Sequence, residues 1–252
     1  MRPVRPSKRR WAAFLLAAGA GVLLLCQALS AASAPLKPKK ALDRFGIAMI
    51  VPTLPGGREW YSKWDNARPR VLKSRVDPDD PEFDTGHGDS VCEIDGRGVL
   101  KAAGRTPRLY VYDHSGRSGW GSVEITLYGM RVKEAAAVGY AGLMAYAKTN
   151  HTVDAEICED LGYGGRLTYD GRADFEKEIA HHVSNGGYVQ TAEVHPWPGA
   201  GAMPKNVWIG YKFIARDADG GKSVKLELWR DMTDGKNGGK WELLTSTTDA
   251  GE

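Results

Sequence analysis

The longest regular alternation of apolar and polar residues along the chain spans residues 207–229. A period of two predicts strands that bury one face and expose the other. Residues 217–222 separate the two halves and supply the aspartates and glycines of a turn. We therefore predict an antiparallel hairpin. Its inward positions are Val207, Ile209, Tyr211, Phe213, Ala215, Val224, Leu226 and Leu228.

Shorter segments with a similar alternation recur on both sides of this hairpin. They predict strands at residues 45–51, 91–94, 99–102, 108–112, 120–132, 140–149, 188–195 and 241–245. Residues 174–182 (DFEKEIAHH) are predicted as a short helix, and residues 77–88 as a loop because Pro, Asp and Gly crowd this stretch. Many short strands with at most one short helix predict an all-β fold, an antiparallel β-sandwich of the jelly-roll type.

The first 34 residues differ in composition from the rest of the chain. A basic start precedes the apolar run of residues 11–25, and Ala32-Ser33-Ala34 follows as a small-residue cleavage site. This order predicts a secretory signal. The apolar run is short for a membrane span, which needs ~20 residues, but an uncleaved anchor remains the alternative. Residues 35–40 are predicted as a linker and residues 41–252 as one domain, secreted to the extracellular space or the periplasm, with no membrane contact after cleavage.

Removal of the signal changes the charge balance. The whole chain has 34 basic and 31 acidic residues. Five of the basic residues lie in the signal, so the rest of the chain has 29 basic residues against 31 acidic ones. A nearly neutral domain without a basic patch gives no indication of a nucleic-acid partner.

Two cysteines, Cys92 and Cys158, remain after the signal. In an exported protein they predict one disulfide, with two buried free thiols as the alternative. Neither cysteine has a neighbour at zinc-ligand spacing, so no metal or other cofactor is predicted. The carboxylates of residues 77–88 leave a structural calcium ion open, although their spacing does not support one.

Several aromatic residues stand among charged ones on faces that alternation directs away from the core. Aromatic rings beside hydrogen-bonding side chains suit sugars, which stack on rings and bind polar groups through their hydroxyls. This pattern predicts a polysaccharide as the partner. The alternative is a surface-interaction protein without a glycan ligand, if a second sheet or loop covers the rings. The predicted carbohydrate-binding residues are Trp208, Trp229, Lys212, Glu227, Glu124 and Tyr128.

Glu193 and His195 place a carboxylate and an imidazole two residues apart on one predicted strand face. A neutral imidazole can abstract a proton alpha to a uronate carboxylate, and a cation such as Lys212 can stabilise the resulting charge. The alternative function is therefore a polysaccharide lyase that cleaves a uronate polymer by β-elimination, with His195, Glu193 and Lys212 as catalytic groups. The other interpretation of Glu193 and His195 is a solvent-facing strand end.

With these features the chain resembles the concanavalin A-like jelly-roll group, and within it the alginate-lyase-type polysaccharide lyases and related secreted carbohydrate-binding domains. Glu193-Val194-His195 is similar to the Gln-x-His strand of those lyases, with glutamate in place of glutamine. Val123-Glu124-Ile125-Thr126 resembles their Arg-Thr-Glu-Leu-Arg strand without its arginine. Their last strand, Tyr-x-Lys-x-Gly-x-Tyr, has no counterpart before Glu252. The resemblance implies a jelly roll that binds a polysaccharide on its concave face, and either a fragmentary gene or an absent lyase activity would account for the missing strand.

Overall fold

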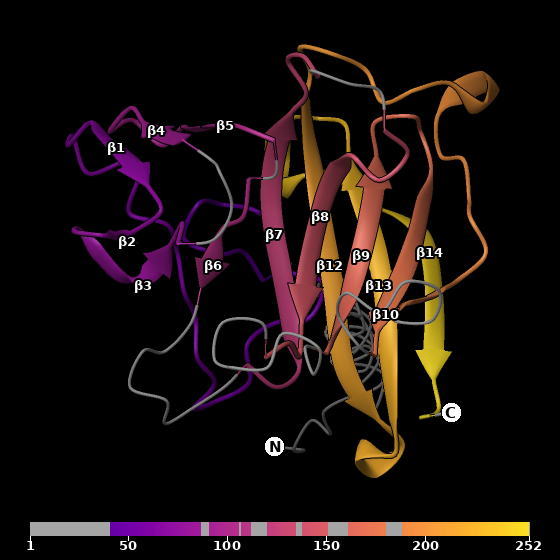
Figure 1. The fold of residues 1–252 in the computed structure, drawn as a ribbon. Coiled ribbons are helices and arrows are strands. Elements are labelled where there is room, and N and C mark those ends of the chain that lie inside the picture. The colour runs from indigo at the N-terminus through magenta and orange to yellow at the C-terminus, as the bar shows by residue number, and fades with distance from the viewer. Residues whose placement is uncertain are drawn as a thin grey trace, which may run out of the picture. The chain divides into compact units, whose positions relative to one another are not determined.

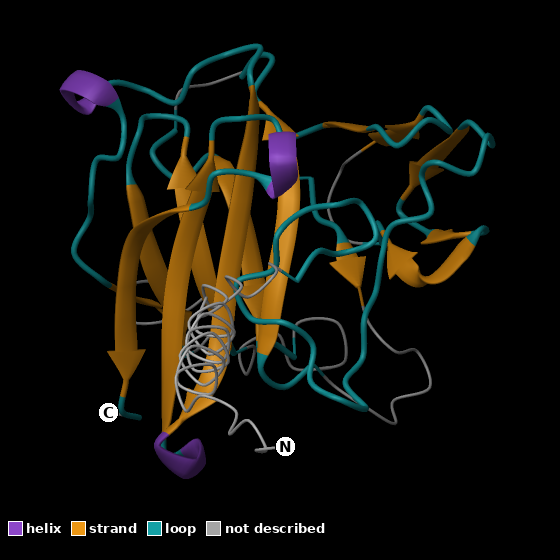
Figure 2. Cartoon of the chain, turned by 180° about the vertical axis from the view of Figure 1, so that it is seen from behind, coloured by secondary structure: helices purple, strands orange, loops and turns teal. Residues whose placement is uncertain are grey.

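The computed structural model describes residues 41–86, 91–105, 107–111, 120–134, 138–150, 161–179 and 188–251. The predicted signal and linker lie outside this set. Ala41–Glu252 form one compact unit. Its sheets are antiparallel, and two four-stranded sheets stack face to face (Figure 1). No α-helix occurs among the described residues, which contain only short 3₁₀ turns (Figure 2). The predicted all-β sandwich is confirmed.

The first sheet of the sandwich has the strand order β14-β13-β12-β7. The predicted hairpin is confirmed, because β12 pairs antiparallel with β13 from Gly210↔Asp231 to Ala218↔Ser223. A 3₁₀ turn at Asp219–Gly221 joins the two strands. The strands are β7 (Val123–Met130), β12 (Trp208–Ala218), β13 (Ser223–Asp231) and β14 (Glu242–Asp249).

The second sheet has the order β11-β10-β9-β8. Its strands are β8 (Gly142–Ala147), β9 (Gly162–Thr168), β10 (Ala173–Glu178) and β11 (Tyr188–Gln190). The predicted helix at residues 174–182 is wrong, since residues 174–178 belong to β10 and residues 180–182 lie outside the described set. Glu and Lys favour helices, but pairing with β9 and β11 overrides that weak preference. Strand β9 was not predicted, because glycine is rare in strands.

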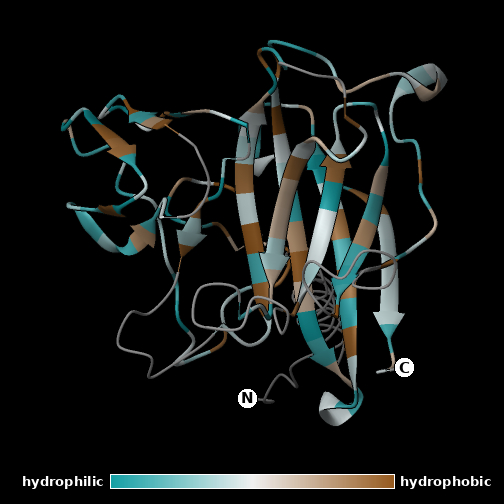
Figure 3. Cartoon of the chain, in the orientation of Figure 1, coloured by the Kyte–Doolittle hydropathy of each residue, from teal (hydrophilic) through white to brown (hydrophobic). Residues whose placement is uncertain are grey.

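The main core lies between the two sheets. Along the sandwich strands, hydrophobic residues alternate with hydrophilic ones (Figure 3), and the hydrophobic ones meet in this layer. Tyr211 links the layers: its hydroxyl donates to the Gly165 carbonyl (2.6 Å) and accepts from the Ala145 amide (3.0 Å). The buried side chains of this core are Ala147, Leu167, Ala173, Phe175, Trp197, Met203, Ile209, Tyr211, Phe213, Ala215, Leu226 and Leu228.

Two three-stranded sheets complete the unit, and both views place them beside the edge strand β7 (Figures 1 and 2). One has the order β1-β4-β5, with β1 (Arg70–Lys73), β4 (Val91–Ile94) and β5 (Leu100–Ala103). The other has the order β2-β3-β6, with β2 (Val76–Asp77), β3 (Asp80–Asp84) and β6 (Tyr110–Val111). A smaller core of Leu72, Phe83, Cys92 and Ile94 lies among them.

The loop prediction for residues 77–88 is therefore wrong at β3. Its acidic side chains are neutralised, which lets this charge-rich stretch form a strand. Asp80 accepts from the indole of Trp60 (3.0 Å) and pairs with Lys63 (3.3 Å), and Asp77 pairs with Arg70. Two of the carboxylates for which calcium was left open, Asp77 and Asp80, thus have partners within the chain.

The predicted disulfide is not supported by the described residues. Cys92 is a free thiol in the structure, and Cys158 lies outside the described residues. The side chain of Cys92 points into the smaller core, where burial raises the pKa of its thiol. Its place on the inward face of β4 suits a small apolar residue, which is how buried free cysteines behave.

The remaining strand predictions are confirmed in part. Those at residues 91–94, 99–102, 108–112, 120–132, 140–149 and 241–245 are confirmed within the described residues, with shifted ends. The prediction at residues 45–51 is wrong, since only an isolated bridge, Leu42↔Ala48, forms there. The strand predicted at residues 188–195 ends at Gln190, and Val194 makes a single bridge to Ala173.

Candidate functional site

The predicted carbohydrate-binding residues lie on the outer face of the β14-β13-β12-β7 sheet. In the strand register Lys212 stands opposite Thr126 on β7 and Trp229 on β13. Trp208 and Trp229 are half-buried and do not belong to the core between the sheets. Their predicted direction is confirmed. The burial of the polar residues between them was not expected.

Lys212 is the centre of this face, and it is only 1% exposed. Its ammonium group lies 2.6 Å from Glu124 Oε1, donates to Thr126 Oγ1 (2.6 Å) and stands 4.4 Å from the ring centroid of Trp241. Burial lowers the pKa of Lys212, and the negative charge of Glu124 opposes this shift. A buried pair of this kind persists when hydrogen bonds satisfy both partners.

The N-terminal part of the unit covers this pair. Glu124 Oε2 accepts hydrogen bonds from the amides of Ile50 (2.9 Å) and Val51 (2.7 Å). The Glu124 side chain is therefore only 8% exposed. The middle of the predicted ligand face is occupied by the chain itself, and this cover explains the burial of Lys212.

Tyr128 has a structural partner on the same face. Its hydroxyl donates to Asp231 Oδ2 (3.0 Å). Burial alone would raise the pKa of Asp231, but hydrogen bonds from Thr233, Gly235 and Lys240 outweigh burial and hold the pKa at about 2. Asp231 thus organises the turn after β13, and Tyr128 supports it.

Trp229 and Glu227 form a separate group at the β13 side of this face. The indole of Trp229 donates to Glu227 Oε2 (3.3 Å), and Glu227 Oε1 pairs with Lys225 (2.9 Å) and Arg216 (3.3 Å). Of the six predicted binding residues, the structure joins Trp229 to Glu227 and Lys212 to Glu124. Trp208 stands apart at the start of β12, opposite Met130.

The three groups expected of a lyase are not brought together. Glu193 pairs with Arg172 beside the other sheet, and His195 is exposed in the segment after β11. Lys212 lies buried on the outer face of the first sheet. Proton abstraction from the alpha carbon and stabilisation of the charge on the neighbouring carboxylate need both groups around one sugar residue, and this arrangement does not provide that.

A different set of polar residues meets on the outer face of the β11-β10-β9-β8 sheet. Arg166 on β9 stands opposite Asp174 on β10. Its Nε donates to Asp174 Oδ1 (2.7 Å), its Nη2 contacts Asp174 Oδ2, and its Nη1 donates to Glu176 Oε2 (2.9 Å). All three residues are buried. One guanidinium group therefore holds two carboxylates side by side.

Tyr146 extends this network from β8 across β9. Its hydroxyl donates to Glu176 Oε1. The ring can cross β9 because glycines leave room: a Cβ at Gly164 would lie 3.1 Å from Tyr146 Cζ, and one at Gly162 3.2 Å from Tyr146 Cδ1. From β11, the Gln190 amide donates to Glu176 Oε2 (3.3 Å). We define the β8–β11 polar face as Tyr146, Arg166, Asp174, Glu176 and Gln190.

The guanidinium group of Arg166 stays charged on the β8–β11 polar face. Burial alone would lower the pKa of Arg166, but Asp174 and Glu176 outweigh burial and raise it. The rim at one end is also ionic, since Arg172 binds Asp170 (2.9 Å) and Glu193. Gln190 is exposed and Tyr146 is half-buried, so the network reaches the surface at these two residues.

Sequence reasoning missed the β8–β11 polar face because β10 was interpreted as a helix. A signal was present in Ala173-Asp174-Phe175-Glu176, where small or aromatic residues alternate with acids at a period of two. This alternation places both acids on one strand face. No sequence feature indicated that Tyr146 would reach Glu176.

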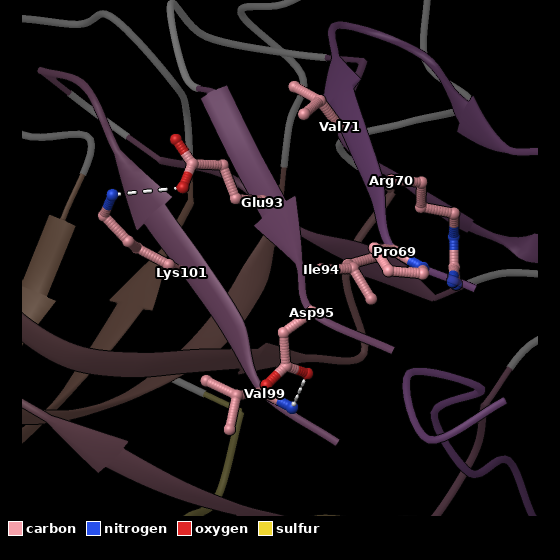
Figure 4. Close-up of a pocket in the computed structure, with 8 residues that line it drawn as sticks. All are labelled: Pro69, Arg70, Val71, Glu93, Ile94, Asp95, Val99 and Lys101. Atoms are coloured by element: carbon pink, nitrogen blue, oxygen red, sulfur yellow. Dashed lines mark hydrogen bonds and ion pairs between the residues drawn. The ribbon is translucent and has the colours of Figure 1, made fainter. Parts of the chain in front are cut away.

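An open hollow of about 540 Å³ lies against the β1-β4-β5 sheet (Figure 4). Its polar side chains already have partners. Glu93 pairs with Lys101 (3.1 Å), and Asp95 accepts the amides of Arg97 (2.7 Å) and Val99 (3.0 Å). No aromatic ring lines it, so it offers little to a sugar. The lining residues are Pro69, Arg70, Val71, Glu93, Ile94, Asp95, Val99 and Lys101.

Within the described part of the chain, no group of three or more His, Cys, Asp or Glu side chains is arranged to hold a metal ion. No helix in that part is long and apolar enough to cross a bilayer. Comparison of the chain with protein-family models, with curated proteins and with solved structures finds no match. The two outer faces of the sandwich therefore remain as the candidate binding surfaces.

Proposed function

We propose that this protein is a secreted carbohydrate-binding β-sandwich of the concanavalin A-like jelly-roll type, and that it binds a polysaccharide on the β8–β11 polar face. One observation carries the proposal. The Tyr146 ring lies against the glycine backbone of β9 while its hydroxyl is fixed on Glu176. The ring is thus a platform whose position is set before any ligand arrives.

The residues around this platform suit sugar hydroxyls. The exposed Gln190 supplies an amide at the surface, and the buried carboxylates of Glu176 and Asp174 hold the network beneath it in place. Sugar sites combine an aromatic surface with a few fixed polar groups of this kind. A network that is already ordered also lowers the entropic cost of binding.

The opposite face differs in that a described segment of the chain covers its charged pair. There the amides of Ile50 and Val51 occupy Glu124, and Lys212 is buried beneath them. A glycan could reach Lys212 and Glu124 only after displacing this segment. Trp229 and Glu227 stay closer to the surface, which makes Trp229 the natural competitor in a test.

A glycan array probed with the purified protein tests the proposal. We expect the protein to be retained on at least one class of polysaccharide. Tyr146→Ala should weaken the affinity for that polysaccharide at least tenfold, which corresponds to about 1.4 kcal/mol of binding free energy. Trp229→Ala is the matched aromatic control and should keep binding. Loss in Trp229→Ala with full binding in Tyr146→Ala would move the site to the opposite face. No retention on any glycan would contradict the proposal and favour a surface-interaction protein.

Export is part of this proposal and rests on the basic start, apolar run and Ala32-Ser33-Ala34 of the predicted signal. N-terminal sequencing of protein recovered from the growth medium or periplasm should begin at or near Pro35. Recovery of an intact N-terminus in the membrane fraction would show an anchor instead.

A further inference from the structure

We infer that Lys212 and Glu124 condense to a covalent amide that links β12 to β7. The structure shows the ion pair from which this amide forms. The inference follows from the contact between the two groups, from their burial, from the donors on the carboxylate and from a hydroxyl group beside both. It is independent of glycan binding, which we place on the other sheet.

The two reacting groups are in contact and shielded from water. Lys212 Nζ lies 2.6 Å from Glu124 Oε1, and the two side chains are only 1% and 8% exposed. Groups held in such contact react as if at very high concentration, with effective molarities of about 10⁵ M or more when they are well oriented. Condensation releases water, and burial keeps solvent away from the reverse hydrolysis.

The amine of Lys212 is the nucleophile. Burial lowers the pKa of Lys212 against the opposing charge of Glu124, so the neutral amine is easier to reach than on an exposed lysine. Desolvated lysines of this kind act as nucleophiles in enzymes. Arg166, which holds carboxylates on the other sheet, cannot react in this way because its guanidinium group stays protonated.

The carboxylate of Glu124 is the electrophile. Its Oε2 accepts hydrogen bonds from the backbone amides of Ile50 (2.9 Å) and Val51 (2.7 Å). When an amine attacks Cδ, negative charge develops on one carboxyl oxygen. Two amides that point at this oxygen form the arrangement of an oxyanion hole. The other oxygen, Oε1, faces Lys212 and is the one that leaves as water.

Thr126 provides a path for the protons. Its hydroxyl oxygen lies 2.6 Å from Lys212 Nζ and 3.5 Å from Glu124 Oε1. The ammonium group first transfers one proton to Oε1, which gives a neutral amine and a carboxylic acid. As the amine attacks Cδ, a second proton passes through the Thr126 hydroxyl to Oε1.

The reaction balances without another reactant. The bond between Lys212 Nζ and Glu124 Cδ forms, the Cδ–Oε1 bond breaks, and Oε1 leaves as water with the two protons from the amine. The amide nitrogen keeps one hydrogen. One ammonium and one carboxylate thus give one neutral amide and one water, and no oxidant, reductant or cofactor is consumed.

Tryptic mapping of the purified and then denatured protein tests the inference. Trypsin cleaves after a free lysine but not after a lysine whose amine is acylated. We expect most of residues 118–131, which contain Glu124, and residues 206–216, which contain Lys212, to be recovered as one joined species. Its mass should be lower than the sum of the two peptides by one water. Recovery of residues 118–131 and 206–212 as separate peptides, without the joined species, overturns the inference.

An exposed ion pair in the same digest is the internal control. Lys101 Nζ lies 3.1 Å from Glu93 Oε2, but these side chains are 68% and 54% exposed. Trypsin should therefore cleave fully after Lys101. A joined species at Lys101 would show that contact alone produces an amide, and it would overturn the argument from the buried site.

Two variants connect the amide to the site. Lys212→Arg keeps the positive charge but not the nucleophile, so it should give no joined species. Thr126→Val keeps the side-chain shape and removes the hydroxyl, so it should lower the joined fraction severalfold in protein of equal age. A joined species in Lys212→Arg overturns the inference, and an unchanged fraction in Thr126→Val overturns the proton path. The digest of the parent protein decides the inference even if a variant does not fold.

Discussion

The two outer faces of the sandwich both bury charged side chains, but they do so by different means. On the β7–β14 side, Lys212 and Glu124 are closed by Ile50 and Val51 from another part of the chain. On the β8–β11 side, the described contacts of Arg166 come from the neighbouring strand β10. The first arrangement fastens a segment onto a sheet. The second fixes a polar surface in place, as a binding site requires.

The buried ion pairs of the two faces also differ in the groups that they bind. Burying charges costs free energy that the pair recovers only with good geometry, so such a pair is weak evidence for stability in itself. On the covered face the pair has an evident structural task, because Glu124 receives backbone amides that need acceptors. On the β8–β11 polar face Glu176 receives side-chain donors from the described residues, and the backbone there is paired within the sheet.

The largest effect we predict is on the covered face. Lys212→Met should lower the free energy of unfolding by ~3–5 kcal/mol, because it leaves Glu124 buried without its cation. The double variant Lys212→Met/Glu124→Leu should recover much of this loss, since both charges then disappear. Urea denaturation measures both values. A Lys212→Met protein as stable as the parent would show that the segment around Ile50 does not hold this face closed.

A smaller effect concerns the pH dependence of stability on the β7–β14 side. The pKa of Asp231 is about 2 in the folded protein, below its ordinary value of 3.8. Its hydrogen bonds therefore stabilise the fold above pH 4 by ~2 kcal/mol, and this contribution is lost as the pH falls from about 4 to 2. Asp231→Asn should be less stable than the parent at pH 6, and the gap should narrow toward pH 3 in denaturation curves. A gap that stays constant with pH would contradict this assignment.

The sequence predicts those parts of the fold in which one strand face is uniformly apolar. Residues 207–229 are the clearest case, and the structure confirms both strands and the outward direction of Trp208 and Trp229. Strand β10 was not predicted, because its acidic residues and its lysine are typical of the surface of a helix. Within β10, only Ala173 and Phe175 belong to the buried core. The local sequence pattern determines the secondary structure where one strand face is uniformly apolar. Elsewhere, pairing with neighbouring strands determines it.

The candidate site was harder to predict than the fold. Tyr146 and Glu176 are 30 residues apart and lie on strands separated by β9. The glycines that let the ring cross, Gly162 and Gly164, lowered the expected strand propensity of β9. The burial of Lys212 was hidden for a similar reason, since alternation gives the face of a strand but not the segment that covers it.

The most discriminating comparison uses one substitution on each face. Tyr128 and Tyr146 both donate a hydroxyl hydrogen bond to a carboxylate, Asp231 and Glu176 respectively. Each carboxylate keeps other donors, so Tyr128→Phe and Tyr146→Phe should each lower the free energy of unfolding by only ~1 kcal/mol.

The effects of these two substitutions on glycan binding should differ. Tyr146→Phe frees the ring from its anchor and should weaken glycan binding severalfold, whereas Tyr128→Phe should leave it unchanged. Denaturation and calorimetry on the same two proteins provide both measurements. Equal binding by both variants would mean that the hydroxyl does not position the ring for a ligand.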